Sequence, residues 1–288
     1  MTDLLAFRKL FKIPIPVDEH VHYYINTLAK SEEFAHLPAL LDEFKEFEAR
    51  CPVSPKRTRQ ETMERLVHHL EALPTYQEMQ NYPLPSTVPT CDRRNHFADG
   101  RWLISFDLVA ANFTILKSFG SDLTTWEDLC TQLDVDPLLT KSKSFRQIVF
   151  GHLNPKRSQR FQAVEIDRIW RAFDKPEFEL VFKQHDELVI TSEEVPIEEL
   201  VSLARRVCHR DVMLPVRRTL HKKEHLEGKN QYIVTKYDPD TLEPTQTSLF
   251  GIQGNRYMIE FKKHIIKEPL DDRDKLFMSD GKLAMWLE

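Results

Sequence analysis

Between residues 178 and 191 the chain contains the run Phe178-Glu-Leu-Val-Phe-Lys-Gln-His-Asp-Glu-Leu-Val-Ile-Thr191. Two apolar stretches, Phe178 to Lys183 and Leu188 to Thr191, flank the polar residues Gln184 to Glu187. Strong β-formers on both sides of a short polar segment are typical of a β-hairpin. The sequence therefore predicts a hairpin with acidic side chains at its tip.

A second apolar run, Trp102-Leu-Ile-Ser-Phe-Asp107, also ends on an acid and precedes a predicted helix from Ala110 to Phe119. Burying an ionised carboxylate without a counter-charge costs free energy, so such an aspartate is hydrogen-bonded, exposed at a sheet edge or bound to a metal. If the two strands are neighbours, the carboxylates of Asp107 and Asp186 lie within about 3 to 6 Å, as in a two-metal site. For either aspartate alone, a turn-capping role is the simpler interpretation.

Helical signals surround these strands. A helix from Lys143 to Phe150 is predicted to end at Gly151, and Asn154-Pro155 provides an N-cap and a first-turn proline for a long helix to about Phe173. Apolar spacing also predicts helices over four further stretches: Val17 to Leu28, Pro38 to Phe47, Thr58 to Leu73 and Ile197 to Cys208.

The remaining segments show other patterns. Residues 74–99 hold four prolines and no clear period, which predicts an irregular connector. After Val212 the signals favour strands, at Tyr232 to Lys236, Ser248 to Ile252 and Tyr257 to Phe261, with a turn at Asp238-Pro-Asp240. We expect an α/β (α+β) fold with three parts: a helical subdomain with its connector at 1–95, a core at 96–220 and a β-rich extension at 221–288.

Composition excludes several classes of protein. The chain has 288 residues, 41% apolar and 30% charged, with 40 Lys and Arg against 45 Asp and Glu, the balance of a soluble globular protein. Its 7 glycines form neither GxGxxG nor GxxxxGK[ST], which argues against dinucleotide-binding and P-loop sites. Four unevenly spaced cysteines, Cys51, Cys91, Cys130 and Cys208, and the absence of an 18-residue apolar run predict an intracellular protein without a membrane partner. The reducing compartment expected is the cytoplasm, the nucleus or a viral factory.

Charge is segregated along the chain. Lys141 to Arg171 carries eight basic and two acidic residues, whereas Lys175 to Glu199 carries two basic and eight acidic residues. This pattern suits a protein that binds phosphates on one side and metal cations on the other, although solvated helix faces give the same pattern. For a phosphate groove, we expect four cations to line one surface: Arg146, Lys156, Arg157 and Arg160.

Three segments resemble motifs A, B and C of family A DNA polymerases, in that order. They are Trp102 to Asp122 with the core Ser105-Phe-Asp-Leu-Val-Ala-Ala-Asn-Phe-Thr-Ile-Leu-Lys-Ser-Phe-Gly-Ser-Asp122, then Phe145-Arg-Gln-Ile-Val-Phe-Gly151, then Phe182-Lys-Gln-His-Asp-Glu-Leu-Val-Ile190. The His-Asp-Glu tip is the most specific of the three. The resemblance covers about residues 100 to 220 and implies a palm-like antiparallel sheet.

The resemblance also implies roles for individual residues. It makes Asp107 and Asp186 ligands of two Mg²⁺ ions, or Mn²⁺, with the backbone carbonyl of Leu108 beside the first. His185 and Glu187 would support the primer end and the metal site. The implied nucleotide-binding residues are Arg146 at the triphosphate, Phe150 near the sugar, Asn112 and Lys143.

The chain departs from the family pattern at three positions. Asn112 stands where the family has the glutamate that helps to exclude ribose, Ser142 where it has an arginine, and Asn154 where it has a tyrosine. The interval from motif A to motif C is also short, with little room for a full fingers domain.

The resemblance implies metal-dependent nucleotidyl transfer to a nucleic-acid 3′ end, with DNA or RNA and a nucleoside triphosphate as partners. The departures favour an alternative, a non-catalytic palm that binds nucleic acid or a replication partner. A structural protein without nucleic-acid contact is a third hypothesis, which the nearly neutral total charge permits.

Overall fold

A computed structural model describes residues 4–94, 100–210, 214–226, 231–252, 254–280 and 282–287. The fold combines many helices with one large antiparallel sheet, so the predicted α+β class is confirmed. The helices are α1 Leu4–Phe11, α2 Val21–Leu28, α3 Leu37–Arg50, α4 Pro55–Ala72, α5 Pro74–Asn81, α6 Ala111–Lys117, α7 Trp126–Gln132, α8 Pro137–Lys141, α9 Lys143–His152, α10 Pro155–Arg171, α11 Ile197–Arg210 and α12 Gly254–Phe261.

The strands form two sheets in the described part of the chain. Seven strands pair antiparallel in the order β1-β3-β4-β2-β5-β6-β7, and β8 and β9 form a separate hairpin. Their bounds are β1 Cys91–Asp92, β2 Trp102–Leu108, β3 Glu179–Gln184, β4 Glu187–Thr191, β5 Val216–His225, β6 Tyr232–Tyr237, β7 Pro244–Phe250, β8 Leu276–Ser279 and β9 Lys282–Met285.

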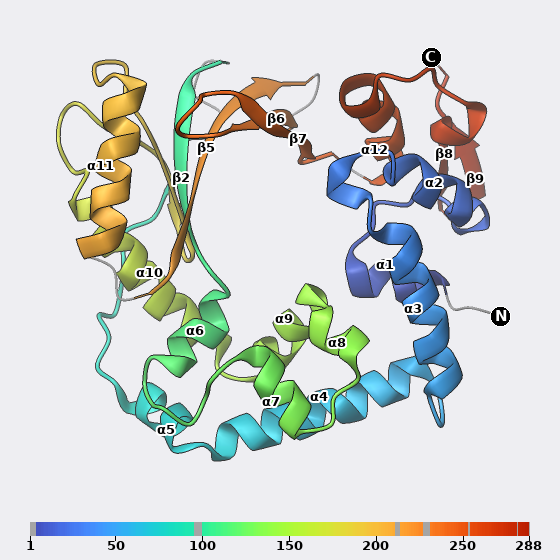
Figure 1. Ribbon diagram of the computed structural model, residues 1–288, viewed down its shortest axis with the longest axis horizontal. Helices are drawn as coiled ribbons and strands as arrows, with labels where there is room; N and C mark the ends of the chain where they lie inside the picture. The colour runs from blue at the N-terminus through green and yellow to red at the C-terminus, as the bar shows by residue number, and fades with distance from the viewer. Residues whose placement is uncertain are drawn as a thin grey trace.

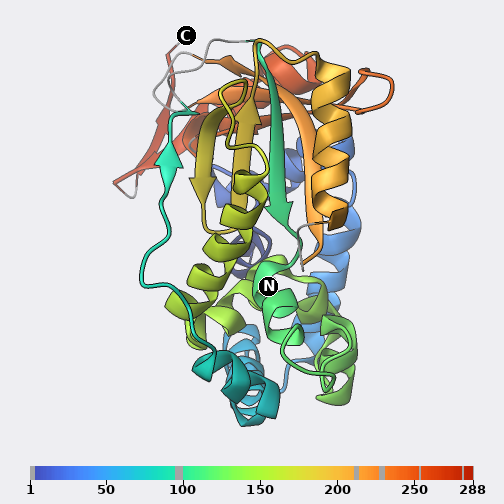
Figure 2. The ribbon, with the colours of Figure 1, turned by 90° about the vertical axis from the view of Figure 1, so that its left-hand side faces the viewer.

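Strand β2 lies in the middle of the large sheet, between β4 and β5. Successive side chains of a strand point to opposite faces, so Ile104, Phe106 and Leu108 enter the main hydrophobic core. Helices α10 and α11 cover this face of the sheet (Figure 2). Full burial of a side chain such as Phe106 contributes about 1.5 to 3 kcal/mol to the free energy of unfolding. The opposite face carries Leu103, Ser105 and Asp107.

The predicted hairpin and helix caps are confirmed. Strands β3 and β4 pair antiparallel and meet at Gln184 and Glu187, which leaves His185 and Asp186 as the turn. The Asn154 side chain accepts a hydrogen bond from the backbone N–H of Arg157 at 3.2 Å, and so begins α10 as its N-cap. These elements therefore follow from local sequence signals.

Three expectations about the elements are wrong. Residues 74–99 are not wholly irregular, because Pro74 starts the short helix α5, which buries Tyr76 and Met79. Tyr257 to Phe261 is part of helix α12 rather than a strand, since Tyr257, Met258 and Phe261 follow helical spacing and a short apolar run does not distinguish the two. Helix α9 continues through Gly151 to His152 instead of ending at that glycine. Helices α7 and α8 lie where we predicted no element.

The elements are arranged as a ring (Figure 1). The large sheet lies on one side, α4 and α5 run along the bottom, and α1 to α3 return on the other side to meet the C-terminal elements. The predicted boundary near residue 95 lies outside the described residues, and the one at 220 falls within β5. Cys51, Cys91 and Cys130 are free thiols, whereas the Cys208 side chain lies outside the described residues.

Ser142 connects the helix that carries Arg146 to the N-terminal helices. Its hydroxyl accepts from the backbone N–H of Phe145 at 3.1 Å and donates to the carbonyl oxygen of Leu10 at 3.0 Å. The residue is 1% exposed. Ser142 is therefore both the N-cap of α9 and a link to α1.

We expect Ser142→Ala to lower the free energy of unfolding by about 1 to 2 kcal/mol, because it removes a cap and leaves a buried carbonyl without its donor. Ser54 caps α4 in an exposed position, so Ser54→Ala is the matched control, with a loss of about 0.5 kcal/mol. Equilibrium urea unfolding measures both. Equal losses would contradict the linking role of Ser142.

Candidate functional site

The turn of the β3–β4 hairpin lies against the end of β2. The backbone N–H of Leu108 donates to the carbonyl oxygen of Asp186 at 2.9 Å. In the sheet register, Asp107 is directly opposite Glu187 on β4 and Arg217 on β5. Antiparallel pairing thus brings acids from two distant segments to one end of the sheet.

Two residues with left-handed backbone shape the site. His185 has φ 31° at the first position of the hairpin turn, as two-residue hairpin turns require. Ala110 has φ 49° between β2 and α6, where the chain reverses direction. The reversal starts α6 at Ala111, and it places Asn112 in the first helical turn beside the end of β2.

A cavity of about 420 Å³ opens at this end of the sheet. Its lining comes from β2 and α6, from α9 and α10, from the hairpin turn and from β5. Seven of the nine predicted site residues line it: Asp107, Leu108, Asn112, Lys143, Arg146, Phe150 and Asp186. His185 and Glu187 are not part of the lining, although Glu187 is paired with Asp107 in the sheet.

The acids of the site are close enough to repel one another. Partial burial raises the pKa of Asp107 above its ordinary value, and the charge of Asp186 raises it further, while Arg217 and Lys143 oppose these effects. Burial also raises the pKa of Glu187, and Asp107 adds to that effect. The acidic cluster is therefore destabilised by its own charge and would be relieved by a cation.

The donor set fits a hard divalent cation. Carboxylate oxygens are the ligands that Mg²⁺ prefers, and Mg²⁺ is usually held by one or two carboxylates together with water and substrate phosphates. Asp107 and Asp186 supply two such carboxylates to the lining of the cavity. Across the described ranges, no group of three or more His, Cys, Asp or Glu side chains is placed to hold a metal. A metal at this site thus needs further ligands from water or substrate.

Three cations line the cavity together with the two aspartates. Lys143 and Arg146 are one turn apart on α9, and Arg217 projects from β5. We did not predict Arg217. The alternation of side chains along β5 predicts which of its residues share a face of the sheet. Only the strand register shows that Arg217 lies opposite Asp107.

Phe150 contributes little free surface to the cavity. It is 6% exposed, and its ring packs against Phe113 at 6.4 Å and Trp126 at 6.0 Å between centroids. Phe150 is mainly a core residue whose edge reaches the cavity wall, so its expected stacking on a sugar stays a prediction.

The departures from the family pattern have structural explanations. The Asn112 side-chain oxygen accepts from Ser158 Oγ at 2.6 Å and from Gln162 Nε2 at 2.7 Å, which fixes the amide against α10. Ser142 and Asn154 are the N-caps of α9 and α10. The residues that replace the family's arginine and tyrosine thus start the two helices.

The groove expected from four cations stays a prediction, and Arg157 has partners of its own within the protein. Its guanidinium donates to the carbonyl oxygens of Met79, at 2.6 Å, and Tyr82, and so holds the connector after α5. Of the four, only Arg146 lines the cavity.

Comparison with known proteins identifies no family for this chain. The sequence matches no protein-family model, and a search of curated proteins gives no match. None of the described helices is both long and apolar enough to span a membrane.

Asp186→Asn should raise the melting temperature of the metal-free protein by about 1 to 3 °C, because it removes repulsion from Asp107. Ionised Asp107 destabilises the fold above its raised pKa, so the gain should disappear as the pH falls through that pKa. Thermal unfolding in EDTA measures the shift, with the exposed Asp174→Asn as control.

With added Mn²⁺ the wild type should gain stability and Asp186→Asn should not. The same Mn²⁺ gain in both proteins would contradict the metal site.

Proposed function

We propose that this protein transfers nucleotides to the 3′ end of a nucleic acid, using a metal held by Asp107 and Asp186 in a palm-like sheet. The main support is one cavity that collects side chains from three segments, which follow one another in the order of motifs A, B and C. Asp107 and Asp186 are 79 positions apart in the sequence, yet both line this cavity. The three segments that carry the family resemblance therefore contribute to one site.

Each end of the cavity has its own chemistry. Asp107 and Asp186 would hold Mg²⁺, which when bound activates the attacking hydroxyl and offsets charge on the transferred phosphate. Lys143 and Arg146 project from α9 towards this end and provide donors for a triphosphate. Arg217 approaches from β5 on the other side and holds a phosphate of the growing strand.

The opposite wall is suited to a sugar. Asn112 and Gln162 line it, and the Asn112 oxygen is already occupied by two donors. The Asn112 amide nitrogen is then the group that faces a ligand, as a hydrogen-bond donor to a sugar hydroxyl. This wall lacks the carboxylate that excludes ribose, so we propose that the site accepts both ribose and deoxyribose.

A second candidate function is a palm that binds nucleic acid without catalysis. It is favoured by Ser142, which caps α9 where the family has an arginine for the triphosphate. The cavity then has fewer phosphate-binding groups than an active family member. Activity and binding assays separate the two candidates.

Asp186→Asn should reduce primer extension by about 10³-fold or more, since it removes charge needed in the transition state. Affinity for the primer strand should change less than about twofold, because Asp186 is exposed at the hairpin turn. Extension with Mg²⁺ or Mn²⁺, with ribo- and deoxynucleotides, and with and without template measures the first. Asp174→Asn should keep full activity.

The two candidates give different results in that assay. Loss of extension in Asp186→Asn alone supports catalysis. No incorporation by the wild type under any of these conditions, together with intact binding of the primer strand, would contradict catalysis and favour the binding module.

Arg146→Ala should raise the KM for the nucleoside triphosphate by about 10- to 100-fold, because a hydrogen bond to a charged group contributes about 1.5 to 3 kcal/mol. Arg160→Ala is the matched control, since Arg160 is exposed on α10 and does not line the cavity. Steady-state kinetics with the wild type and both variants tests this role. Equal effects of the two substitutions would contradict it.

A further inference from the structure

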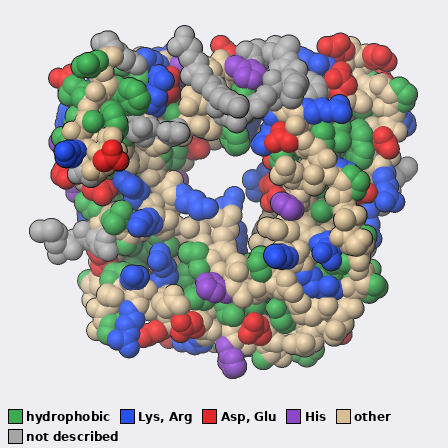
Figure 3. Space-filling view, turned by 180° about the vertical axis from the view of Figure 1, so that it is seen from behind, with side chains coloured by type: hydrophobic (Ala, Val, Ile, Leu, Met, Phe, Trp, Pro, Cys, Tyr) green, Lys and Arg blue, Asp and Glu red, His purple; other side chains and the backbone are tan. Residues whose placement is uncertain are grey.

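The ring of elements leaves an opening through the molecule. Figure 3 shows this opening, with Lys and Arg side chains on its margin. The face of the large sheet that α10 and α11 leave uncovered borders it, and the C-terminal elements lie on the far side (Figure 1). The candidate site is at the end of β2, on the wall of the opening.

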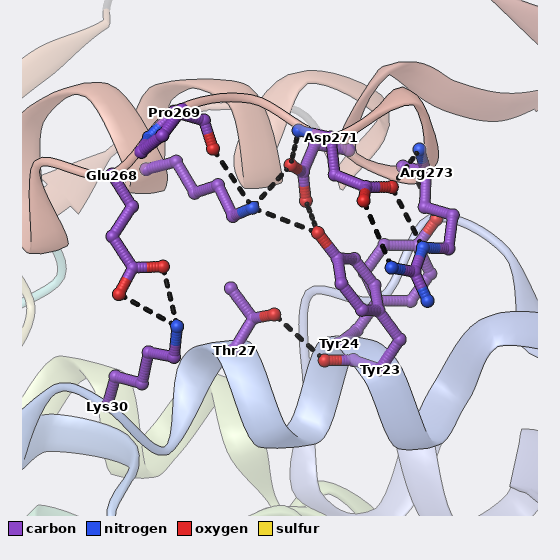
Figure 4. Close-up of polar contacts among 10 residues, drawn as sticks. Tyr23, Tyr24, Thr27, Lys30, Glu268, Pro269, Asp271 and Arg273 are labelled. Atoms are coloured by element: carbon purple, nitrogen blue, oxygen red, sulfur yellow. Dashed lines mark hydrogen bonds and ion pairs between the residues drawn. The ribbon is translucent and has the colours of Figure 1, made fainter.

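The ring is closed by contacts between α2 and the C-terminal elements. We call the four residues Tyr23, Tyr24, Lys262 and Asp274 the clasp (Figure 4 shows these contacts). The Lys262 ammonium lies 2.7 Å from Asp274, and the Tyr23 hydroxyl donates to Asp274 at 2.8 Å. The Tyr24 hydroxyl donates to the carbonyl oxygen of Arg273 at 2.7 Å.

The clasp is buried and its charges are satisfied. Asp274 is 0% exposed and Lys262 is 6% exposed. The backbone N–H of Asp271 also donates to Asp274 at 2.6 Å, and Lys262 donates to Tyr23 at 2.9 Å. Opening the ring would break the hydrogen bonds of Tyr23 with Asp274 and Lys262 and that of Tyr24 with Arg273, so these contacts stabilise the closed ring.

Further contacts join the same two parts. Lys30, two residues after the end of α2, pairs with Glu268 at 2.6 Å. Phe34 packs on Tyr257 and Phe261, with ring centroids 6.4 and 6.0 Å apart. Polar and apolar contacts together close the ring between segments more than 200 residues apart in the sequence.

The wall formed by the sheet is suited to a polyanion. A second cavity of about 210 Å³ lies on the uncovered face and shares that face with Asp107. The two cavities are lined by six cations, Arg94, Lys143, Arg146, Arg217, Lys223 and Lys236, against three acids. The three acids are Asp107, Asp186 and Glu187, the cluster that a metal would neutralise.

Aromatic side chains accompany these cations. Tyr232 and Phe250 line the second cavity, and Phe250 is 52% exposed. Tyr232 is only 3% exposed, so Phe250 is the ring of the two that a base can reach. An exposed ring among cations is typical of surfaces that bind a single strand, because its bases have free faces for stacking. In duplex DNA the faces of the bases are already stacked on one another, so they are not available to the aromatic side chains of this wall.

We infer that the protein encircles one strand of nucleic acid, which passes through the opening beside Asp107 and Asp186 while the clasp keeps the ring closed. The inference rests on the proposed function for the chemistry of the ligand, but it does not require catalysis. A closed ring retains its strand by topology, so dissociation requires the strand end or an open clasp.

A covalent bridge across the closure tests the encirclement. The double variant combines Lys30→Cys with Glu268→Cys, and its native cysteines are replaced. It is first loaded onto circular single-stranded DNA in EDTA. A short bis-maleimide then joins the two new cysteines. The bridge closes residues 30 to 268 into a covalent ring. The matched control is Arg57→Cys with Glu61→Cys, an ion pair at 2.8 Å within α4 that does not close the ring.

We expect the bridged protein to stay on circular DNA in SDS at least 10-fold better than on linear DNA of the same sequence, and to be released when a nuclease cuts the circle. The control pair should be released from both. Bridging before DNA is added should block loading onto circles but allow threading onto linear strands, a result that does not depend on SDS.

Four outcomes would overturn the inference. Release from circular and linear DNA to the same extent in SDS places the strand outside the ring, and so does loading of the bridged protein onto circles. Retention on duplex circles rather than single-stranded circles would overturn the single strand as the occupant. No binding of either DNA at low salt would contradict the proposed function as well.

Discussion

The antiparallel pairing of β2 with β4 on one side and β5 on the other determines the candidate site. It sets Asp107 opposite both Glu187 and Arg217, and it brings the hairpin turn with Asp186 against the end of β2. The core side of β2 is buried under α10, so a register shift by one residue would bury Asp107 and expose Phe106. Hydrophobic burial on one face of the sheet therefore holds the repelling acids together on the other.

Local signals in the sequence were sufficient for the elements that form the site. Two apolar, β-rich runs on either side of a short polar segment predicted the hairpin, and Asn154-Pro155 predicted the start of α10, because these signals act over a few neighbouring residues. Contacts between segments far apart in the sequence could not be predicted from such local signals. Arg217 joins the site only through the register of β5 with β2. The short apolar run of α12 does not by itself distinguish a helix from a strand, because tertiary packing decides between the two.

The positions that depart from the polymerase pattern take part in folding. Ser142 links α9 to α1, and Asn112 is held by Ser158 and Gln162 of α10. The N-terminal and C-terminal parts of the chain meet where Tyr23 donates to Asp274 and Tyr24 donates to the carbonyl oxygen of Arg273, which closes the ring.

A crystal structure with Mn²⁺ and a nucleoside triphosphate tests the metal site most directly, because the anomalous signal of Mn²⁺ locates the ion. We expect an anomalous peak bound by the carboxylates of both Asp107 and Asp186, which should lie within about 3 to 6 Å of each other, with the triphosphate against Arg146. Carboxylates more than about 10 Å apart on rigid strands, or Mn²⁺ bound elsewhere with none between the two aspartates, would contradict the account.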